Sequence, residues 1–198
     1  MLDLYLSEEA KRKKQGLPSL PLNSEQTALL VELLKKDSVQ SPDLLMGLLE
    51  NRVPAGVDQA AFVKASFLND VACGKVKSHF ISDDYAIKML GTMLGGYNVQ
   101  SLVALLKTDK ADLAAKALSK ITLIFDAFYD VEKLHKDGNS SATNLIKSWA
   151  EAEWFSSRKI IPNSIRVIIF KAEGETNTDD LSPAQDAWSR ADIPLHAK

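Results

Sequence analysis

The chain has 198 residues, of which 45% are hydrophobic and 25% are charged, the proportions of an ordinary globular protein. This length suffices for one domain and part of a second. With 24 Lys and Arg residues against 26 Asp and Glu residues, the net charge is -2, which excludes a global basic field for nucleic acid or anionic membranes. Any such binding would have to be local.

Cysteine content and the N-terminal sequence further limit the classes of protein to which the chain can belong. Cys73 is the one cysteine, so the chain cannot form an internal disulfide or by itself complete a zinc or iron–sulfur site. We expect it to be a small buried residue. No stretch approaches the ~20 apolar residues of a membrane span, and the N-terminus lacks the positive flank and apolar run of a signal peptide. We therefore expect no metal site in this chain, no membrane partner and a cytoplasmic location.

In chain order, most of the sequence predicts helices. After the first, each helix opens at a residue that can cap or begin a first turn, and most helices stop before glycine or proline. A proline-containing connector separates the first two. The predicted helices span 2–14, 23–36, 42–49, 58–74, 82–95, a short segment from 98, a longer one from 109 or 112 toward 138, and 139–155.

These helices pair along the sequence. Helices 23–36 and 42–49 are rich in leucine and joined by a short linker, which is typical of an antiparallel pair; 58–74 and 82–95 predict a second pair. No single pair can bury its own apolar face, so neighbouring pairs must stack. We therefore predict a mainly α fold, an irregular HEAT-like stack of antiparallel helix pairs.

Several residues in the helical part invite a functional interpretation that the pattern does not support. His79 and His135 each lack a second ligand at helical spacing, so we expect surface or capping histidines. Residues 11–14 form a basic run at the end of a helix, where cations complement the helix dipole; an RNA or partner contact is the alternative. Trp149 and Trp154 are expected to pack against the domain that follows.

The segment Ile165–Lys171 is the one convincing strand. Its residues are β-branched or aromatic with apolar side chains on both faces, as in a sheet covered on both sides. The sequence holds no comparable strand to pair with it, and buried backbone groups must be paired. We therefore divide the chain into a helical domain, 1–160, and the truncated start of a second domain, 161–198, whose other strands lie beyond Lys198 or in another chain.

A polar loop follows this strand. Residues 174–183 combine hydroxyls, an amide and two adjacent carboxylates, and Arg190 adds a guanidinium shortly after. Dense polar groups on a loop anchored by a strand usually serve binding or catalysis. An ordinary surface turn, which uses the same residue types, is the alternative.

The loop and further motifs along the chain together resemble the bacterial aconitase B family. The similar segments are NRVP at 51–54, GVD at 56–58, GTM at 91–93, GGYN at 95–98, FYDVE at 128–132, SWA at 148–150, AEWF at 152–155, GETNTDDLSP at 174–183, DAWSR at 186–190 and DIPLHA at 192–197. They cover essentially the whole chain.

The resemblance implies a HEAT-like domain followed by the opening of an α/β swivel domain, in a lyase of the tricarboxylic acid cycle that isomerises citrate and isocitrate via cis-aconitate. It implies a 4Fe–4S cluster whose iron acts as a Lewis acid, with its ligands outside this chain, so the chain alone should be inactive. By motif match, Arg190 binds a substrate carboxylate, as the guanidinium fork suits, and Asp179 is a catalytic carboxylate. Asp180 stands where many relatives carry histidine.

The resemblance also implies partners. These are the tricarboxylate substrate of the full-length enzyme, a second copy or other proteins through the helical domain, and messenger RNA in the cluster-free form. A different function stays open beside the enzyme: a stand-alone helical protein-interaction or RNA-regulatory module without catalysis. Cysteines and further strands encoded past Lys198 would favour the enzyme.

Overall fold

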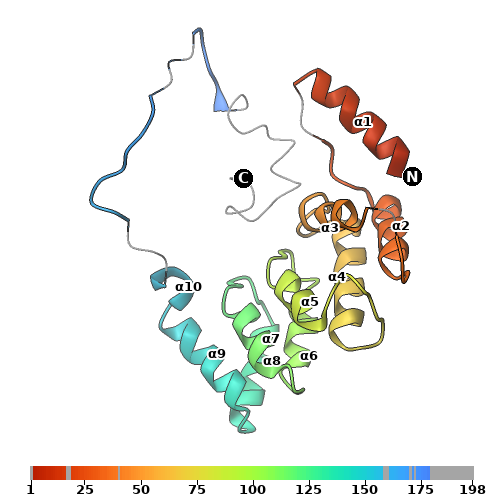
Figure 1. Ribbon diagram of the computed structural model, residues 1–198. Helices are drawn as coiled ribbons and strands as arrows, with labels where there is room; N and C mark the ends of the chain where they lie inside the picture. The colour runs from red at the N-terminus through yellow and green to blue at the C-terminus, as the bar shows by residue number, and fades with distance from the viewer. Residues whose placement is uncertain are drawn as a thin grey trace.

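The computed structural model describes residues 2–16, 19–39, 41–157, 161–169, 171 and 173–178. Regular structure in these ranges is α-helical, as the sequence predicted for the part of the chain up to residue 155. The helices are α1 (Leu2–Lys14), α2 (Ser24–Leu34), α3 (Pro42–Asn51), α4 (Gln59–Ala72), α5 (Asp83–Leu90), α6 (Val99–Leu105), α7 (Ala111–Leu118), α8 (Ala127–Lys136), α9 (Ser140–Ala150) and α10 (Glu153–Ser156) (Figure 1).

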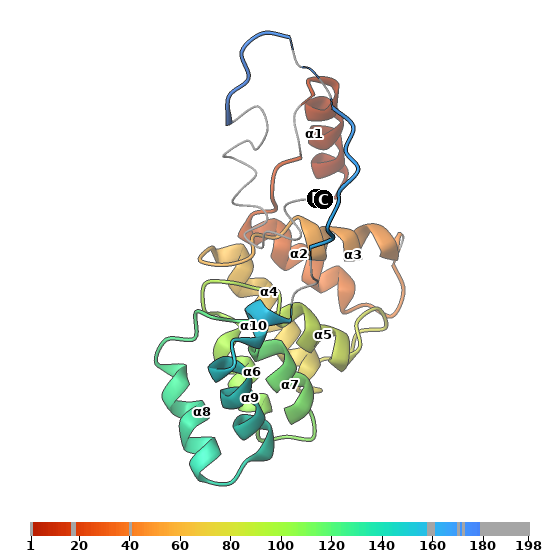
Figure 2. The same ribbon diagram turned by 90° about the vertical axis from the view of Figure 1, so that its left-hand side faces the viewer.

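The helices from α2 onward form one continuous stack. Helix α2 packs against α4, α4 against α5, α5 against α7, and α7 against α9, which also packs against α8. Helix α1 stands apart at one end, while α8 and α9 lie at the other (Figures 1 and 2). The strongest packing of α2 is with α4 rather than with α3, so the first predicted pair is less self-contained than expected.

A continuous apolar core runs through the stack. Its largest fully buried side chains are almost all leucine, spaced three or four residues apart along the helices, so that one face of each helix is removed from water. They include Leu30, Leu34, Leu45, Leu49, Leu68, Ile87, Leu90, Met93, Leu102, Leu105 and Leu106.

Side-chain caps begin α2, α4, α5 and α9, as predicted. Asn23 and Gln26 form a capping box in which each side chain accepts the backbone N–H of the other, at 2.9 and 3.0 Å. The side-chain oxygens of Asp58, Ser82 and Asn139 likewise accept N–H groups in the first turns of α4, α5 and α9. These bonds satisfy donors that have no partner within the helix.

Asn98 precedes α6 as predicted, but its side chain does not cap that helix. It is fully buried, and its Nδ2 donates to the carbonyl oxygens of Leu90, at 2.7 Å, and Met93, at 2.9 Å. These carbonyls lie at and just beyond the end of α5. The Asn98 side chain therefore fastens the end of α5 to the start of α6.

The loop that joins α3 to α4 is in direct backbone contact with the loop that joins α5 to α6. The Leu94 N–H donates to the Ala55 carbonyl at 2.8 Å. A Cβ on Gly56 would lie only 1.8 Å from the Leu94 carbonyl oxygen, and Gly95 has a φ of +83°. Both positions therefore require glycine, which explains two of the glycines in the GVD and GGYN motifs.

Helix α1 is attached through the connector that follows it. The buried Tyr5 hydroxyl donates to the Leu20 carbonyl at 3.0 Å, and the Ser19 hydroxyl donates to the Glu9 carboxylate at 2.6 Å. The Leu22 N–H in turn donates to the Arg52 carbonyl at 2.7 Å, just past the end of α3. The connector thus joins α1 to the stack.

The predicted helix from 109 or 112 toward 138 is wrong: it is two helices, α7 and α8, separated by residues 119–126. This loop contains β-branched residues, and Phe125 adopts a left-handed backbone with φ of 50°. The Trp149 indole N–H donates to the Leu118 carbonyl at the end of α7, at 3.3 Å. Trp149 therefore packs within the helical stack and not against a following domain. The last predicted helix also breaks, at Ala152 with φ of 51°, before α10.

The predicted strand is not formed in the described residues of 165–171. This part of the chain runs in an extended path away from the helices (Figure 1). Its apolar side chains are exposed, to 97% for Ile168 and 89% for Ile169. A strand requires a hydrogen-bonded neighbour, and none of the described segments supplies one.

Candidate functional site

The two predicted site residues, Asp179 and Arg190, lie outside the described residues, as does Asp180. The described residues before them, 173–178, are exposed, and Gly174 has a positive φ of 89°. The roles assigned to Asp179 and Arg190 by resemblance remain predictions.

Titratable side chains that could hold a metal are scattered in the described ranges. These ranges contain no group of three or more His, Cys, Asp or Glu side chains close enough to bind an ion. His79 and His135 are surface residues as predicted: His79 Nε2 lies 3.0 Å from Asp37 Oδ1, and His135 Nδ1 lies 2.8 Å from Thr143 Oγ1. Cys73 is exposed, which corrects the expectation that it is buried, because it lies at the solvent-facing C-terminal end of α4.

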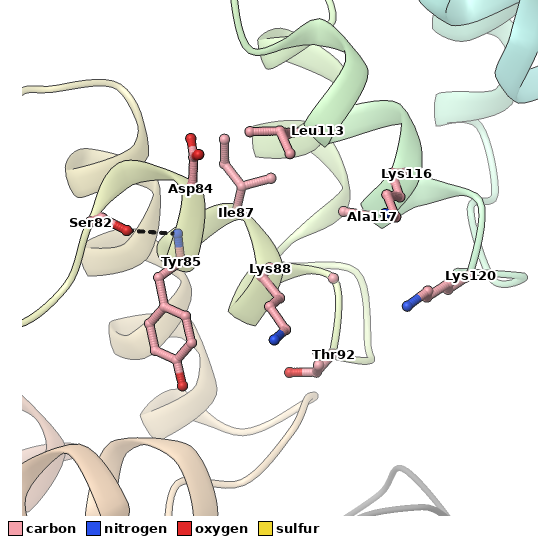
Figure 3. Close-up of a pocket in the computed structure, with 11 residues that line it drawn as sticks. Ser82, Asp84, Tyr85, Ile87, Lys88, Thr92, Leu113, Lys116, Ala117 and Lys120 are labelled. Carbon is pink, nitrogen blue, oxygen red and sulfur yellow. Dashed lines mark hydrogen bonds between the residues drawn. The ribbon is translucent and has the colours of Figure 1, made fainter. Parts of the chain in front are cut away.

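A hollow lies between α5 and α7, and we call it the α5–α7 pocket. Its volume is about 580 Å³. Helix α5 and the turn after it supply one wall, and α7 and its end supply the other (Figure 3). Spacings of three and four residues put the lining side chains of each helix on one face. The lining residues are Ser82, Asp84, Tyr85, Ile87, Lys88, Gly91, Thr92, Leu113, Lys116, Ala117 and Lys120.

The floor of the pocket is apolar and lies where α5 and α7 are in contact. A Cβ on Gly91 would lie 2.9 Å from the Cβ of Ala117, so the end of α5 and α7 are in direct contact. Ile87 and Ala117 are buried beside this contact, whereas Leu113 keeps 37% of its surface exposed.

The rim of the pocket is basic. Lys88, Lys116 and Lys120 are exposed, and none is within ion-pair distance of a carboxylate in the described part of the chain. The carboxylate among the lining residues, Asp84, is 3.2 Å from the ammonium of Lys110, which lies outside the pocket. The rim therefore carries a local positive charge although the chain as a whole carries -2.

Lys110 also neutralises the neighbouring acidic residue at the start of α5. Its ammonium is 2.5 Å from Asp83 Oδ2. The hydrogen bond from Lys110 lowers the pKa of Asp83, and the bonds to Asp83 and Asp84 raise the pKa of Lys110. Lys110 therefore stays charged and offsets the negative charge of Asp83 and Asp84 at the start of α5.

Tyr85 forms part of the wall and cannot act as a base near neutral pH. Its hydroxyl donates to the Glu50 carboxylate on α3, and this hydrogen bond, together with burial, raises the pKa of Tyr85 to about 12. The Lys88 ammonium lies 5.9 Å from the centre of the Tyr85 ring, within cation–π range. The pocket thus offers cations and apolar surface, which suit binding of an anionic ligand more than catalysis.

Sequence reasoning missed this pocket. Lys116 and Lys120, four residues apart at and just past the end of α7, were a usable signal for a local basic patch. Nothing local connected them with Lys88, because the packing of α5 on α7 brings that residue near.

The described helices include none that is both long and apolar enough to cross a membrane. Comparison with known proteins gives two family matches. The model for the aconitate B N-terminal domain matches residues 4–155, and that for the aconitate hydratase 2 N-terminus matches residues 167–198.

Curated relatives match along the same length. The chain is 54% identical over 199 residues to aconitate hydratase B of Salmonella typhimurium and 52% identical over 198 residues to that of Escherichia coli. It is 43% identical over 200 residues to aconitate hydratase B of Helicobacter pylori. Each match covers 100% of this chain and 23% of the relative. With a family model matching most of its length, the chain belongs to the aconitate B N-terminal domain family.

Proposed function

We propose that this chain acts as the N-terminal part of an aconitate hydratase, a lyase that interconverts citrate and isocitrate via cis-aconitate. The similarity to aconitate hydratase B along the whole chain, at 43% to 54% identity to the relatives named above, carries this proposal. Because the chain spans 23% of those relatives, the activity belongs to the chain together with the polypeptide that completes the enzyme.

Within that enzyme, residues 1–160 form a HEAT-like helical domain and 161–198 begin an α/β swivel domain. The two family matches, which end at 155 and begin at 167, support this boundary. The exposed apolar side chains of residues 165–169 support the second domain, since such a surface is normally covered. We propose that this segment becomes a strand when neighbouring strands are present to pair with it.

Arg190 is proposed to bind a substrate carboxylate and Asp179 to act as a catalytic carboxylate. A guanidinium presents two parallel N–H donors, which match the two oxygens of a carboxylate. A tricarboxylate needs several such partners, and the remaining ones would come from polypeptide outside this chain.

This chain does not fit the 4Fe–4S cluster of the family. A cluster takes several cysteine thiolates, whereas the chain has one cysteine, Cys73, which is exposed at the end of α4. Its ligands would therefore lie outside the 198 residues. We expect the isolated chain to show no hydratase activity after iron–sulfur reconstitution, and turnover by the isolated chain would contradict the proposal.

A chimera tests the function directly. This chain replaces the matching segment of Escherichia coli aconitate hydratase B, and we expect the purified, cluster-loaded chimera to hydrate cis-aconitate. In the chimera, Arg190→Lys keeps the charge but loses the bidentate geometry, so kcat/KM should fall by about tenfold or more, which corresponds to about 1.4 kcal/mol.

Arg166→Lys is the matched control, because Arg166 is also an arginine of the C-terminal segment and is exposed. It should change kcat/KM by less than about twofold. A folded, cluster-loaded chimera without activity would refute the enzyme function. Equal losses in the two arginine variants would refute the role of Arg190 alone.

Binding to other protein surfaces is the second candidate function of the helical domain. Large aromatic side chains are exposed near its C-terminal end, with Phe125 at 72% and Tyr129 at 68%. Such residues commonly anchor protein interfaces. If they mediate self-association, Phe125→Ser should shift the sedimentation coefficient toward the monomer, while Leu29→Ser, on exposed surface of α2, should not.

A further inference from the structure

We propose that the α5–α7 pocket is a docking site for an acidic segment of a partner protein, in which carboxylates flank a leucine-like side chain. This inference goes beyond the proposed aconitase function, uses neither Asp179 nor Arg190, and stands independently of them. It rests on three features of the pocket: an apolar floor, a basic rim and a rigid wall.

The floor favours a ligand with an apolar side chain. Ile87 and Ala117 are buried at the bottom, and Leu113, which also lines the pocket, has 37% of its surface exposed. Covering such surface is favourable by about 25 cal/mol per Å². A small hydrophilic anion such as citrate would gain nothing from Leu113, whereas a leucine-sized side chain placed on it would.

The rim favours carboxylates. Lys120 points from the α7 side of the pocket toward the α5 side, where Lys88 lies with the Thr92 hydroxyl beside it (Figure 3). Lys116 stands one helical turn before Lys120. Like charges around one pocket that have no carboxylate partner repel each other, and a bound carboxylate would relieve this repulsion.

The acidic groups near the pocket do not supply that counterion. Asp84, at one end, is already paired with Lys110 at 3.2 Å. Glu50, behind Tyr85, accepts the Tyr85 hydroxyl. That hydrogen bond also fixes the Tyr85 ring as part of a wall formed before any ligand binds, which lowers the entropic cost of docking.

The size and composition of the pocket fit a peptide better than a nucleic acid. A volume of about 580 Å³ accommodates several side chains. Helix-in-groove recognition places apolar anchors on a floor between two helices and charges along its edge, as this arrangement would. Nucleic acid binding, in contrast, relies on phosphate contacts, for which Leu113 and Asp84 are unsuited.

The test uses two fluorescently labelled synthetic peptides and the 198-residue chain. One repeats Glu-Glu-Leu, and the other repeats Lys-Lys-Leu at the same length. Fluorescence anisotropy should show saturable binding of the acidic peptide alone, weakening with added salt. Lys120→Glu and Leu113→Ser should each weaken binding by about fivefold or more, since one removes a rim charge and the other the floor contact.

Each variant has a matched control on α2. Lys36 and Lys120 both lie two residues past the end of a helix, and their backbone N–H groups donate to carbonyls three residues earlier, at 3.1 and 3.3 Å. Lys36→Glu therefore makes the same charge change away from the pocket. Leu29→Ser, at an exposed leucine of α2, controls for Leu113→Ser. Circular dichroism confirms that each variant is folded.

Both controls should bind the acidic peptide within about twofold of the unsubstituted chain. Equal weakening by Lys36→Glu and Lys120→Glu would overturn the proposal, because only net charge would then matter. Displacement of the peptide by millimolar citrate or inorganic phosphate would assign the pocket to small anions instead. Tighter binding of the Lys-Lys-Leu peptide, or of a single-stranded RNA that competes for the pocket, would also overturn it.

Discussion

The backbone crossing at Gly56 provides the sharpest test of the fold. In Gly56→Ala, the new Cβ would lie 1.8 Å from the Leu94 carbonyl oxygen and 2.3 Å from its carbonyl carbon. Cβ atoms essentially never approach other atoms within 3.0 Å, so the two loops must separate by more than an ångström. Backbone cannot rotate away as a side chain can. The separation also breaks the 2.8 Å hydrogen bond from the Leu94 N–H to the Ala55 carbonyl.

These two effects set the expected magnitude. Overpacking of this kind costs about 1–3 kcal/mol, and the lost hydrogen bond adds about 1 kcal/mol. Gly56→Ala should therefore lower the free energy of unfolding by about 2–4 kcal/mol, which in a chain of this size lowers Tm by roughly 5–15 °C. Urea unfolding followed by circular dichroism measures the change, provided that the m value stays constant.

Gly47→Ala is the matched control. Gly47 lies inside α3, and a Cβ there would meet no atom within 4 Å. Alanine is the better helix former, so this variant should gain about 0.5–1 kcal/mol. A Gly56→Ala variant within about 0.5 kcal/mol of the unsubstituted chain would refute the crossing geometry.

The remaining predictions concern hydrogen bonds and pH. Asn98→Ala removes two buried hydrogen bonds at the end of α5, although the Leu90 carbonyl keeps the Met93 N–H as a donor at 3.2 Å, so urea unfolding should show a loss of about 1–3 kcal/mol; a loss below about 0.5 kcal/mol would contradict the proposed role of Asn98 in holding α5 to α6. The pKa of Tyr85, about 12, exceeds that of an unfolded tyrosine. The stability from this group is therefore complete below the unfolded pKa and is lost as pH rises through the folded one. NMR of ring-labelled tyrosine should show the pKa of Tyr85 falling toward its ordinary value in Glu50→Gln, and an unchanged value would contradict the hydrogen bond. Since Lys110 depresses the pKa of Asp83, Lys110→Met should be less stable than the unsubstituted chain near neutral pH. This difference should vanish as pH falls through the folded pKa of Asp83, and a difference that persists in acid would exclude the ion pair as its source.

Helix starts could be predicted because capping is local. Asn23, Asp58, Ser82 and Asn139 each reach a backbone N–H two or three residues ahead. Both partners of such a contact lie within a few residues of each other in sequence, so no distant segment is needed. The same holds for Pro42 at the first position of α3.

Helix ends inside apolar runs could not be predicted in this way. The run from α7 to α8 was predicted as one helix, yet α7 ends at Leu118 and Phe125 adopts a left-handed backbone shortly before α8 begins. The Trp149 indole, 31 residues away, donates to the carbonyl at the end of α7. Similarly, Asn98 resembles a cap in sequence, but its amide serves two carbonyls of the preceding helix. Partners so far along the chain are not visible in a local pattern.

The site divides in the same manner. The loop chemistry around Asp179 and Arg190 was visible in sequence as a dense polar motif, and its geometry lies outside the described residues. The α5–α7 pocket has no motif, because Lys88 on α5 and Lys120 just past the end of α7 line one pocket only through packing. For the strand expected at 165–171, the local sequence pattern was clear but the structure did not follow it. Its side chains favour a β conformation, but hydrogen-bonded neighbours decide whether a strand forms.

The sequence alone determined that this chain is mainly helical, where most of its helices begin, and to which family its motifs are similar, because caps, leucine spacing and motifs are local. Tertiary structure alone decided where the long apolar runs break, why Gly56 and Gly95 must be glycine, and that three lysines surround an apolar hollow. Those features arise from contacts between segments far apart in sequence, whose positions are fixed only when the helices pack.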